Sequence, residues 1–148
     1  MHPFQTLLKW LLLLSGIFLV SAFAAMFLPR AWMATAHQWL GLGEFPDTPI
    51  TFYLTRSTSL LYGVHGVITF VVGVTLKHHW RMVPVLGWLH VFMGISIFVI
   101  DLLAAMPTYW IAAEGLPVAG LGAMILYLFK RADFSDPQNG LNDETSSV

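Results

Sequence analysis

Four long apolar segments constrain this chain more than any other feature of its sequence. They cover approximately residues 6–28, 50–76, 83–105 and 108–129. Each is long enough for the roughly 20 residues that a membrane-spanning helix requires. Prolines lie at or near their limits, at Pro29, Pro49, Pro84 and Pro107. The sequence therefore predicts an all-α integral membrane protein, an up-and-down bundle of four transmembrane helices.

The composition agrees with a bilayer environment. Of the 148 residues, 57% are hydrophobic and only 10% are charged, and the mean hydropathy is +0.71. A soluble domain of this size cannot hide so much apolar surface in one core, because its high surface-to-volume ratio requires a large polar shell. The formal charge is −1 and there is no long basic run, so nucleic acid is not an expected partner.

The sequence indicates one domain and a tail. We find no internal repeat, and we expect a transmembrane domain over residues 1–131. The polar, turn-rich segment 132–148 is predicted to be a flexible C-terminal extension. The chain has no cysteine, which excludes disulfides, thiolate metal sites and dithiol redox chemistry.

The first apolar segment also has features of a secretory signal. Lys9 precedes an apolar run to Val20, and the triplet 22–24 reads Ala-Phe-Ala, the small-x-small pattern of a cleavage site. The apolar run continues to Leu28, so we expect a retained first span.

A short helix is predicted between the first two spans. Apolar residues recur there at helical spacing, namely Trp32, Met33, Ala36, Trp39 and Leu40. This pattern favours a helix over residues 31–40 that lies in the membrane interface. It would seat the loop on the membrane or form a lid over a site between the helices.

The cations predict the orientation. In a four-span topology most of them fall on one side: Lys9, Lys77, Arg81, Lys130 and Arg131. Arg30 is the loop cation on the other side. Since cytoplasmic loops carry the excess of Lys and Arg, both termini are expected in the cytoplasm.

Three ionisable residues within or beside the spans form a candidate cluster. Counted from the inner loop near Trp80, Arg56 and Asp101 differ in height by about 4.5 Å. Glu114 enters from the outer side at a comparable level. An unpaired charge near the bilayer centre costs at least ~2.5 to 3.5 kcal/mol, so the sequence predicts that Arg56, Asp101 and Glu114 meet in the outer leaflet.

Two interpretations of this cluster remain open. Arg56 and Asp101 could form a structural clamp between helices, with Glu114 solvated at the interface. Alternatively, all three could line a ligand or proton site. Pro117 has no N–H for the carbonyl of Ala113, so it predicts a kink or hydrated gap beside Glu114.

Two stripes run along the second span. One carries polar side chains, namely Thr55, Thr58, Tyr62, His65 and Thr69. The other carries Arg56 and the small residues Ser59, Gly63, Gly66 and Gly73, which allow another helix to approach closely. In the third span, Gly87, His90, Gly94 and Asp101 repeat at similar spacing.

The intramembrane histidines raise the question of haem. His65 and His90 could ligate one iron, but counting from Trp80 predicts a height difference of about 7.5 Å. Bonding of His65 to a hydroxyl or carbonyl, with Tyr62 nearby, is the expected alternative. His78 and His79 are expected in a solvated loop, and no metal site is predicted.

The sequence also resembles known membrane proteins. "WLGLGEFPDTP" followed by "YLTRSTSLLYGVHG" resembles a motif pair of uncharacterised bacterial inner-membrane proteins. The four-span arrangement resembles the small bacterial proteins that include the DoxX-like families. The resemblance implies a four-helix bundle in the bacterial inner membrane, and some DoxX-like members are associated with quinone-linked oxidation. No family catalytic residue matches a position here.

These features predict a non-catalytic or accessory membrane protein with a polar pocket in the outer leaflet. No catalytic residue is assigned. The alternative is a redox-associated protein in which Tyr62, His65 and His90 contact a quinone, a lipid or haem. A small lipophilic ligand, a larger membrane complex and a homo-oligomer are the partners left open.

Overall fold

The computed structural model describes residues 3–132 and 134. This part of the chain is helical and contains no β-strand. The helices are α1 (Pro3–Val20), α2 (Ala22–Met26), α3 (Arg30–Trp39), α4 (Pro49–Val74), α5 (Leu76–His79), the 3₁₀ turn η1 (Trp80–Met82), α6 (Val83–Leu103), α7 (Thr108–Ala113) and α8 (Gly115–Arg131).

The four predicted spans are confirmed as long apolar helical stretches. They cover Pro3–Met26, Pro49–Val74, Leu76–Leu103 and Thr108–Arg131, each long and apolar enough to cross a membrane. The second begins as the sequence suggests, with Pro49 in the first turn and Thr48 accepting a hydrogen bond from the Thr51 N–H. The predicted helix in the first loop is α3.

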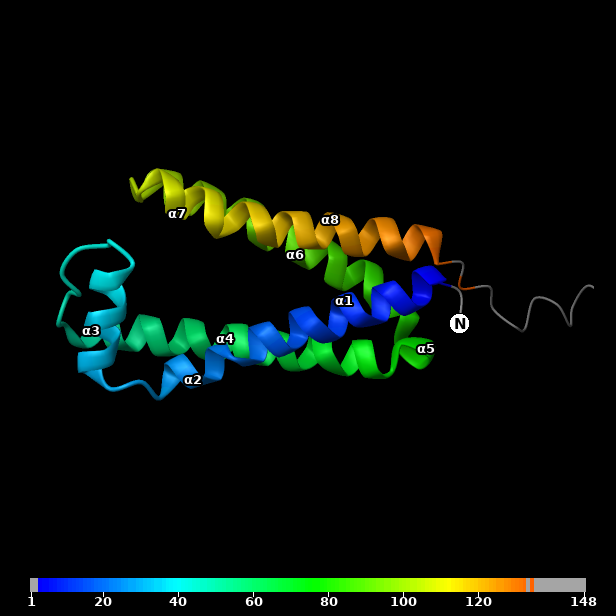
Figure 1. Ribbon diagram of the computed structural model, residues 1–148, viewed down its shortest axis with the longest axis horizontal. Coiled ribbons are helices and arrows are strands. Elements are labelled where there is room, and N and C mark those ends of the chain that lie inside the picture. Colours follow the sequence, from blue (N-terminus) through cyan, green and yellow to red (C-terminus); the bar gives the residue numbers. More distant parts are fainter. Residues whose placement is uncertain (1–2, 133, 135–148) are drawn as a thin grey trace, which may run out of the picture.

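The bundle consists of two helix pairs. The pair α1/α2 packs along α4, and α6 packs along α8, with a further contact between α1 and α8. Figure 1 shows the two pairs meeting at the end that carries α5 and diverging toward the end that carries α3 and α7. The consecutive spans α4 and α6 therefore belong to different pairs. An up-and-down topology does not by itself require this pairing.

Small residues hold each pair together. A Cβ added at Gly66 would lie 2.5 Å from the backbone nitrogen of Val20, and one added at Gly94 would lie 2.3 Å from that of Ala119. Only a residue without a side chain permits so close an approach. The small-residue stripe predicted on α4 is confirmed, since Ser59, Gly63, Gly66 and Gly73 are all buried.

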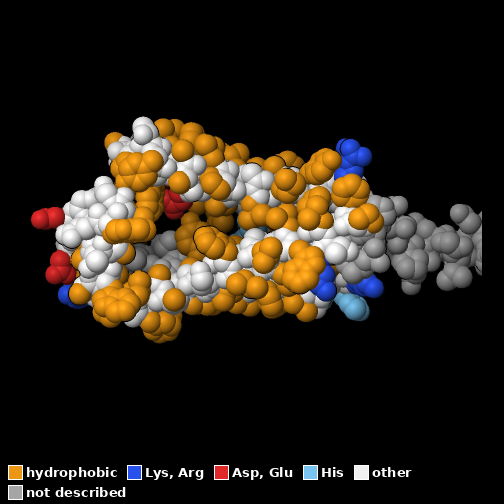
Figure 2. Space-filling model, viewed as in Figure 1, with side chains coloured by type: hydrophobic (Ala, Val, Ile, Leu, Met, Phe, Trp, Pro, Cys, Tyr) orange, Lys and Arg blue, Asp and Glu red, His pale blue; other side chains and the backbone are white. Residues whose placement is uncertain are grey.

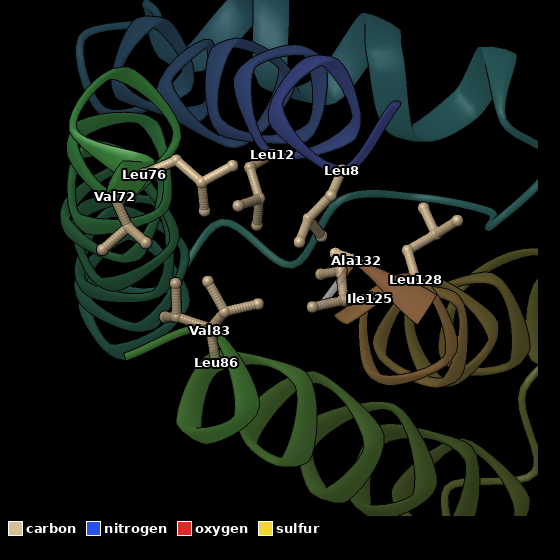
Figure 3. Close-up of a cluster of buried hydrophobic side chains, with 9 residues drawn as sticks. All are labelled: Leu8, Leu12, Val72, Leu76, Val83, Leu86, Ile125, Leu128 and Ala132. Carbon is tan, nitrogen blue, oxygen red and sulfur yellow. The ribbon is translucent and has the colours of Figure 1, made fainter. Parts of the chain in front are cut away.

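The hydrophobic core lies where the two pairs meet. Its members come from α1, α4, α5, α6 and the end of α8, and their side chains point toward one another in Figure 3. They are Leu8, Leu12, Val72, Leu76, Val83, Leu86, Ile125, Leu128 and Ala132. The core thus joins the pairs at one end, and the pairs diverge toward the other end.

The packed region continues slightly beyond the predicted domain limit at residue 131. Ala132 is buried, and its carbonyl accepts a 3.0 Å hydrogen bond from Gln5 Nε2. The Phe134 ring stacks on Trp80, with 5.7 Å between ring centroids. The remainder of the predicted tail, residues 135–148, lies outside the described residues.

Candidate ligand-binding hollow between the helix pairs

The divergence of the two helix pairs leaves an open cavity of about 510 Å³, here named the hollow. Figure 2 shows it between the pairs, with an acidic side chain on its wall. Both pairs contribute to its lining: Phe18, Leu19, Ser21, Ala22, Tyr62, Trp110, Ala113, Glu114, Pro117 and Val118. Its volume is within the range of small-molecule sites in proteins, roughly 300 to 1,000 Å³.

Helix breaks shape both walls of the hollow. On one side, α1 ends at Val20, and the Ser21 hydroxyl donates a 2.6 Å hydrogen bond to the carbonyl of Phe18. On the other side, Glu114 has φ −100° and ψ −71° and separates α7 from α8. The break expected beside Pro117 is therefore confirmed, and it places the Glu114 side chain on the wall.

Two acidic groups and a phenol lie close together at this site. Glu114 and Tyr62 line the hollow, and Asp101 is within electrostatic range of both. Asp101 is only 7% exposed, and its Oδ2 atom has no hydrogen-bond partner in the described structure. Trp110 lines the hollow together with Glu114.

Arg56 does not join this cluster. Its side chain is exposed, and among the described residues it forms no ion pair with Asp101 or Glu114. Arg56 and Asp101 are both eighteen residues from the ends of their helices that adjoin the α5–η1 turn, at Val74 and Val83. The depth argument is therefore sound, but Arg56 precedes Tyr62 by six residues, which turns it about 120° away around the helix.

The histidines lie much closer together than the sequence suggested. The Nε2 atoms of His65 and His90 are 3.4 Å apart, and their ring centroids are 4.7 Å apart. The predicted height difference of about 7.5 Å is wrong, because α4 ends at Val74 and residues 75–82 form a separate turn. Counted from the helix ends, His65 and His90 differ by two residues, or about 3 Å of rise.

This arrangement does not suit haem. Two axial histidines must stand on opposite faces of a porphyrin, whereas these imidazoles contact each other directly. His90 is 1% exposed, and its Nδ1 is 2.8 Å from the carbonyl of Leu86. Within the described residues, no group of three or more His, Cys, Asp or Glu side chains could hold a metal ion.

A second pocket lies beside His65 and shares Tyr62 with the hollow. It measures about 250 Å³ and is lined by Thr58, Leu61, Tyr62, His65 and Met93. Tyr62 lines both cavities. Of the predicted polar stripe of α4, Thr58, Tyr62 and His65 line these cavities, whereas Thr69 is buried.

Sequence reasoning missed one contact at the open end. The Tyr109 hydroxyl at the start of α7 donates a 2.6 Å hydrogen bond to the carbonyl of Leu40, just after α3. This bond links α7 to the segment after α3, at the end where the two helix pairs diverge. Nothing in the sequence patterns indicated this bond or the contribution of Trp110 to the hollow.

The histidine pair leads to a prediction for NMR. A carbonyl oxygen can only accept, so His90 Nδ1 carries the proton and its Nε2, in the neutral ring, accepts from His65 Nε2–H. Nitrogen-15 spectra of histidine-labelled protein are expected to show the δ tautomer for His90 and the ε tautomer for His65. Single His→Gln variants would assign the signals, and an ε tautomer at His90 would contradict this network.

The fold and composition define a four-helix protein whose helices are long and apolar enough for a multi-pass membrane protein. No protein-family model matches the chain, and no curated protein or solved structure similar to it was found. The geometry of the hollow is therefore the basis of the functional proposal below.

Proposed function

We propose that this chain is a non-catalytic membrane protein that binds a lipophilic molecule with a polar group in the hollow. The observation that carries this proposal is the cavity of about 510 Å³ between the helix pairs, whose walls are mostly apolar and contain Tyr62 and Glu114. Binding sites typically combine apolar walls with a few polar groups that orient the ligand. A lipophilic molecule would enter sideways from the bilayer.

The adjoining pocket supports the same proposal. It extends from Tyr62 to His65 and Thr58, so a ligand longer than the hollow would find further polar contacts there. A quinone or a lipid, the ligands expected from the sequence, both combine a polar head with apolar groups.

The ligand that the purified protein retains provides a test of this proposal. Ala113 lines the hollow and is exposed, so Ala113→Phe should fill the space without displacing the core. Ala123 on α8 is also exposed and lines neither cavity, which makes Ala123→Phe the matched control. We expect mass spectrometry of protein in native-lipid nanodiscs to find a lipophilic molecule with wild type and Ala123→Phe that is depleted in Ala113→Phe.

Equal retention by all three proteins, or no retained molecule in wild type, would contradict ligand binding in the hollow. Thermal melting of each purified variant shows whether it is folded, so that loss of ligand is not confused with loss of structure.

We further propose that the protein lies in a bacterial inner membrane with both termini in the cytoplasm and α3 in the outer interface. The cations Lys9, Lys77, Arg81, Lys130 and Arg131 support this orientation, because they gather at the end where the helix pairs meet (Figure 2). The exposed side chains of Trp32 and Trp39 on α3 are suited to an interface.

The absence of native cysteine makes this topology easy to test. A membrane-impermeant maleimide applied to intact spheroplasts is expected to label Glu44→Cys, in the loop after α3, at once. It should label Lys77→Cys, in α5, only after lysis. The reverse pattern would contradict the orientation.

A further inference from the structure

We propose that the molecule bound in the hollow is a lipophilic cation, with its positive group between Tyr62, Trp110 and Glu114. This inference rests on the proposed function and names the chemical class of its ligand. Three features of the hollow carry it: its acidic groups, the position of the cations, and its aromatic walls.

The acidic groups lack a cationic partner in the described structure. Glu114 lies on the wall, and Asp101 is buried with Oδ2 lacking a hydrogen-bond partner. The described ion pair is Arg30 with Asp47, at 3.4 Å on the exposed loop side. Arg56, the cation within α4, has its exposed side chain on another flank of that helix.

A positive ligand would complete this arrangement. Two carboxyl groups in apolar surroundings gain strongly from an opposite charge within a few ångströms, because the local dielectric is far below that of water. A phosphate or carboxylate ligand would add repulsion instead. A neutral ligand would gain nothing from an ionised carboxylate at this site.

The walls favour an organic cation over a small inorganic one. The hollow is lined by the rings of Phe18, Tyr62 and Trp110, and aromatic faces attract a weakly hydrated cation. Small hard cations need several oxygen ligands, whereas most of this lining is apolar. A cation with attached hydrocarbon matches both the charge and the walls.

Tetraphenylphosphonium and tetraphenylborate provide the test, because they share a shape and carry opposite charges. Equilibrium dialysis against the protein in nanodiscs, with empty nanodiscs subtracted, is expected to show saturable binding of the phosphonium and none of the borate. The neutral triphenylphosphine oxide should bind at least about tenfold more weakly than the phosphonium.

Substitution of the acidic residues tests where the positive group of the ligand binds. Glu114→Gln should weaken phosphonium binding at least about tenfold, and Asp101→Asn should weaken it in the same direction. Glu44→Gln makes the same chemical change in the exposed loop and should leave binding unchanged. If Glu114→Gln unfolds at a lower temperature than wild type, phosphonium binding by Asp101→Asn decides the result.

Equal binding of phosphonium and phosphine oxide, or phosphonium binding unaffected by both acidic substitutions, would overturn the cation inference. So would the absence of phosphonium binding to wild type. None of these results would contradict the hollow as a ligand site, since the retained-ligand comparison with Ala113→Phe tests that separately.

Discussion

Replacing Gly94 with isoleucine is expected to force α6 and α8 apart and to destabilise the protein more than any surface substitution. A Cβ at Gly94 would lie 2.3 Å from the Ala119 nitrogen and 2.6 Å from the Gly115 carbonyl oxygen. Both atoms belong to the backbone of α8, so no side-chain rotation can relieve the clash. Overpacking usually costs about 1 to 3 kcal/mol, and we expect about 3 kcal/mol or more here.

Gly120 provides the matched control for this substitution. It lies on α8, and a Cβ there would meet nothing within 4 Å. Thermal melting in detergent should show a large decrease for Gly94→Ile and little change for Gly120→Ile. Equal decreases would mean that helix propensity, and not close helix contact, determines the effect. Because Gly115 adjoins Glu114, Gly94→Ile should also weaken ligand binding.

Truncating Ile125 to alanine is expected to have the second large effect, because this side chain lies in the core that joins the helix pairs. Ile125 is 0% exposed. Deleting buried methyl groups typically costs about 2 to 5 kcal/mol, part of which comes from the remaining cavity. The unfolded state in detergent is also in apolar surroundings, so the cavity should dominate and the loss should be close to 2 kcal/mol.

The adjacent residue is the control. Met124 is 49% exposed, so Met124→Ala removes a long side chain without opening the core. Reversible unfolding in mixed micelles should show the loss for Ile125→Ala and less than about 0.5 kcal/mol for Met124→Ala. Similar losses for both would contradict the position of the core.

The length of the apolar runs was enough to predict the four spans, since a helix needs about 20 apolar residues to cross a bilayer. Proline and glycine gave local detail: Pro49 begins α4, and Pro117 accompanies the break at Glu114. The spacing of Gly63, Gly66 and Gly73 identified the packing face of α4, because small residues at helical spacing have few other uses in a membrane helix.

The relative rotation and tilt of helices could not be obtained in this way. Depth counting placed Arg56 level with Asp101 but carried no information about the direction of the Arg56 side chain. The same counting overestimated the difference in height between His65 and His90, because it treated the residues of the turn formed by α5 and η1 as part of the spans. The divergence of the helix pairs depends on which glycine-bearing helix faces pack against each other. A single sequence does not specify which faces these are.

The direction of the Arg56 side chain changes the interpretation of the site. Glu114 was expected beside Arg56 and Asp101, and Tyr62 beside His65, yet Tyr62 and Glu114 line one open cavity that Arg56 does not line. Because Arg56 does not neutralise these acidic groups, we interpret the site as a candidate binding site and not as a structural cluster.

Photolabelling tests most directly whether the hollow binds a ligand. A diazirine-bearing lipophilic probe, in cationic and neutral forms, would be activated with the protein in nanodiscs, and its adducts mapped by peptide mass spectrometry. We predict saturable adducts on the segments that contain Tyr62, Trp110 and Glu114, lost in Ala113→Phe and kept in Ala123→Phe. Adducts spread evenly over exposed apolar residues such as Leu60 and Val67, and unchanged by Ala113→Phe, would contradict a binding site between the helix pairs.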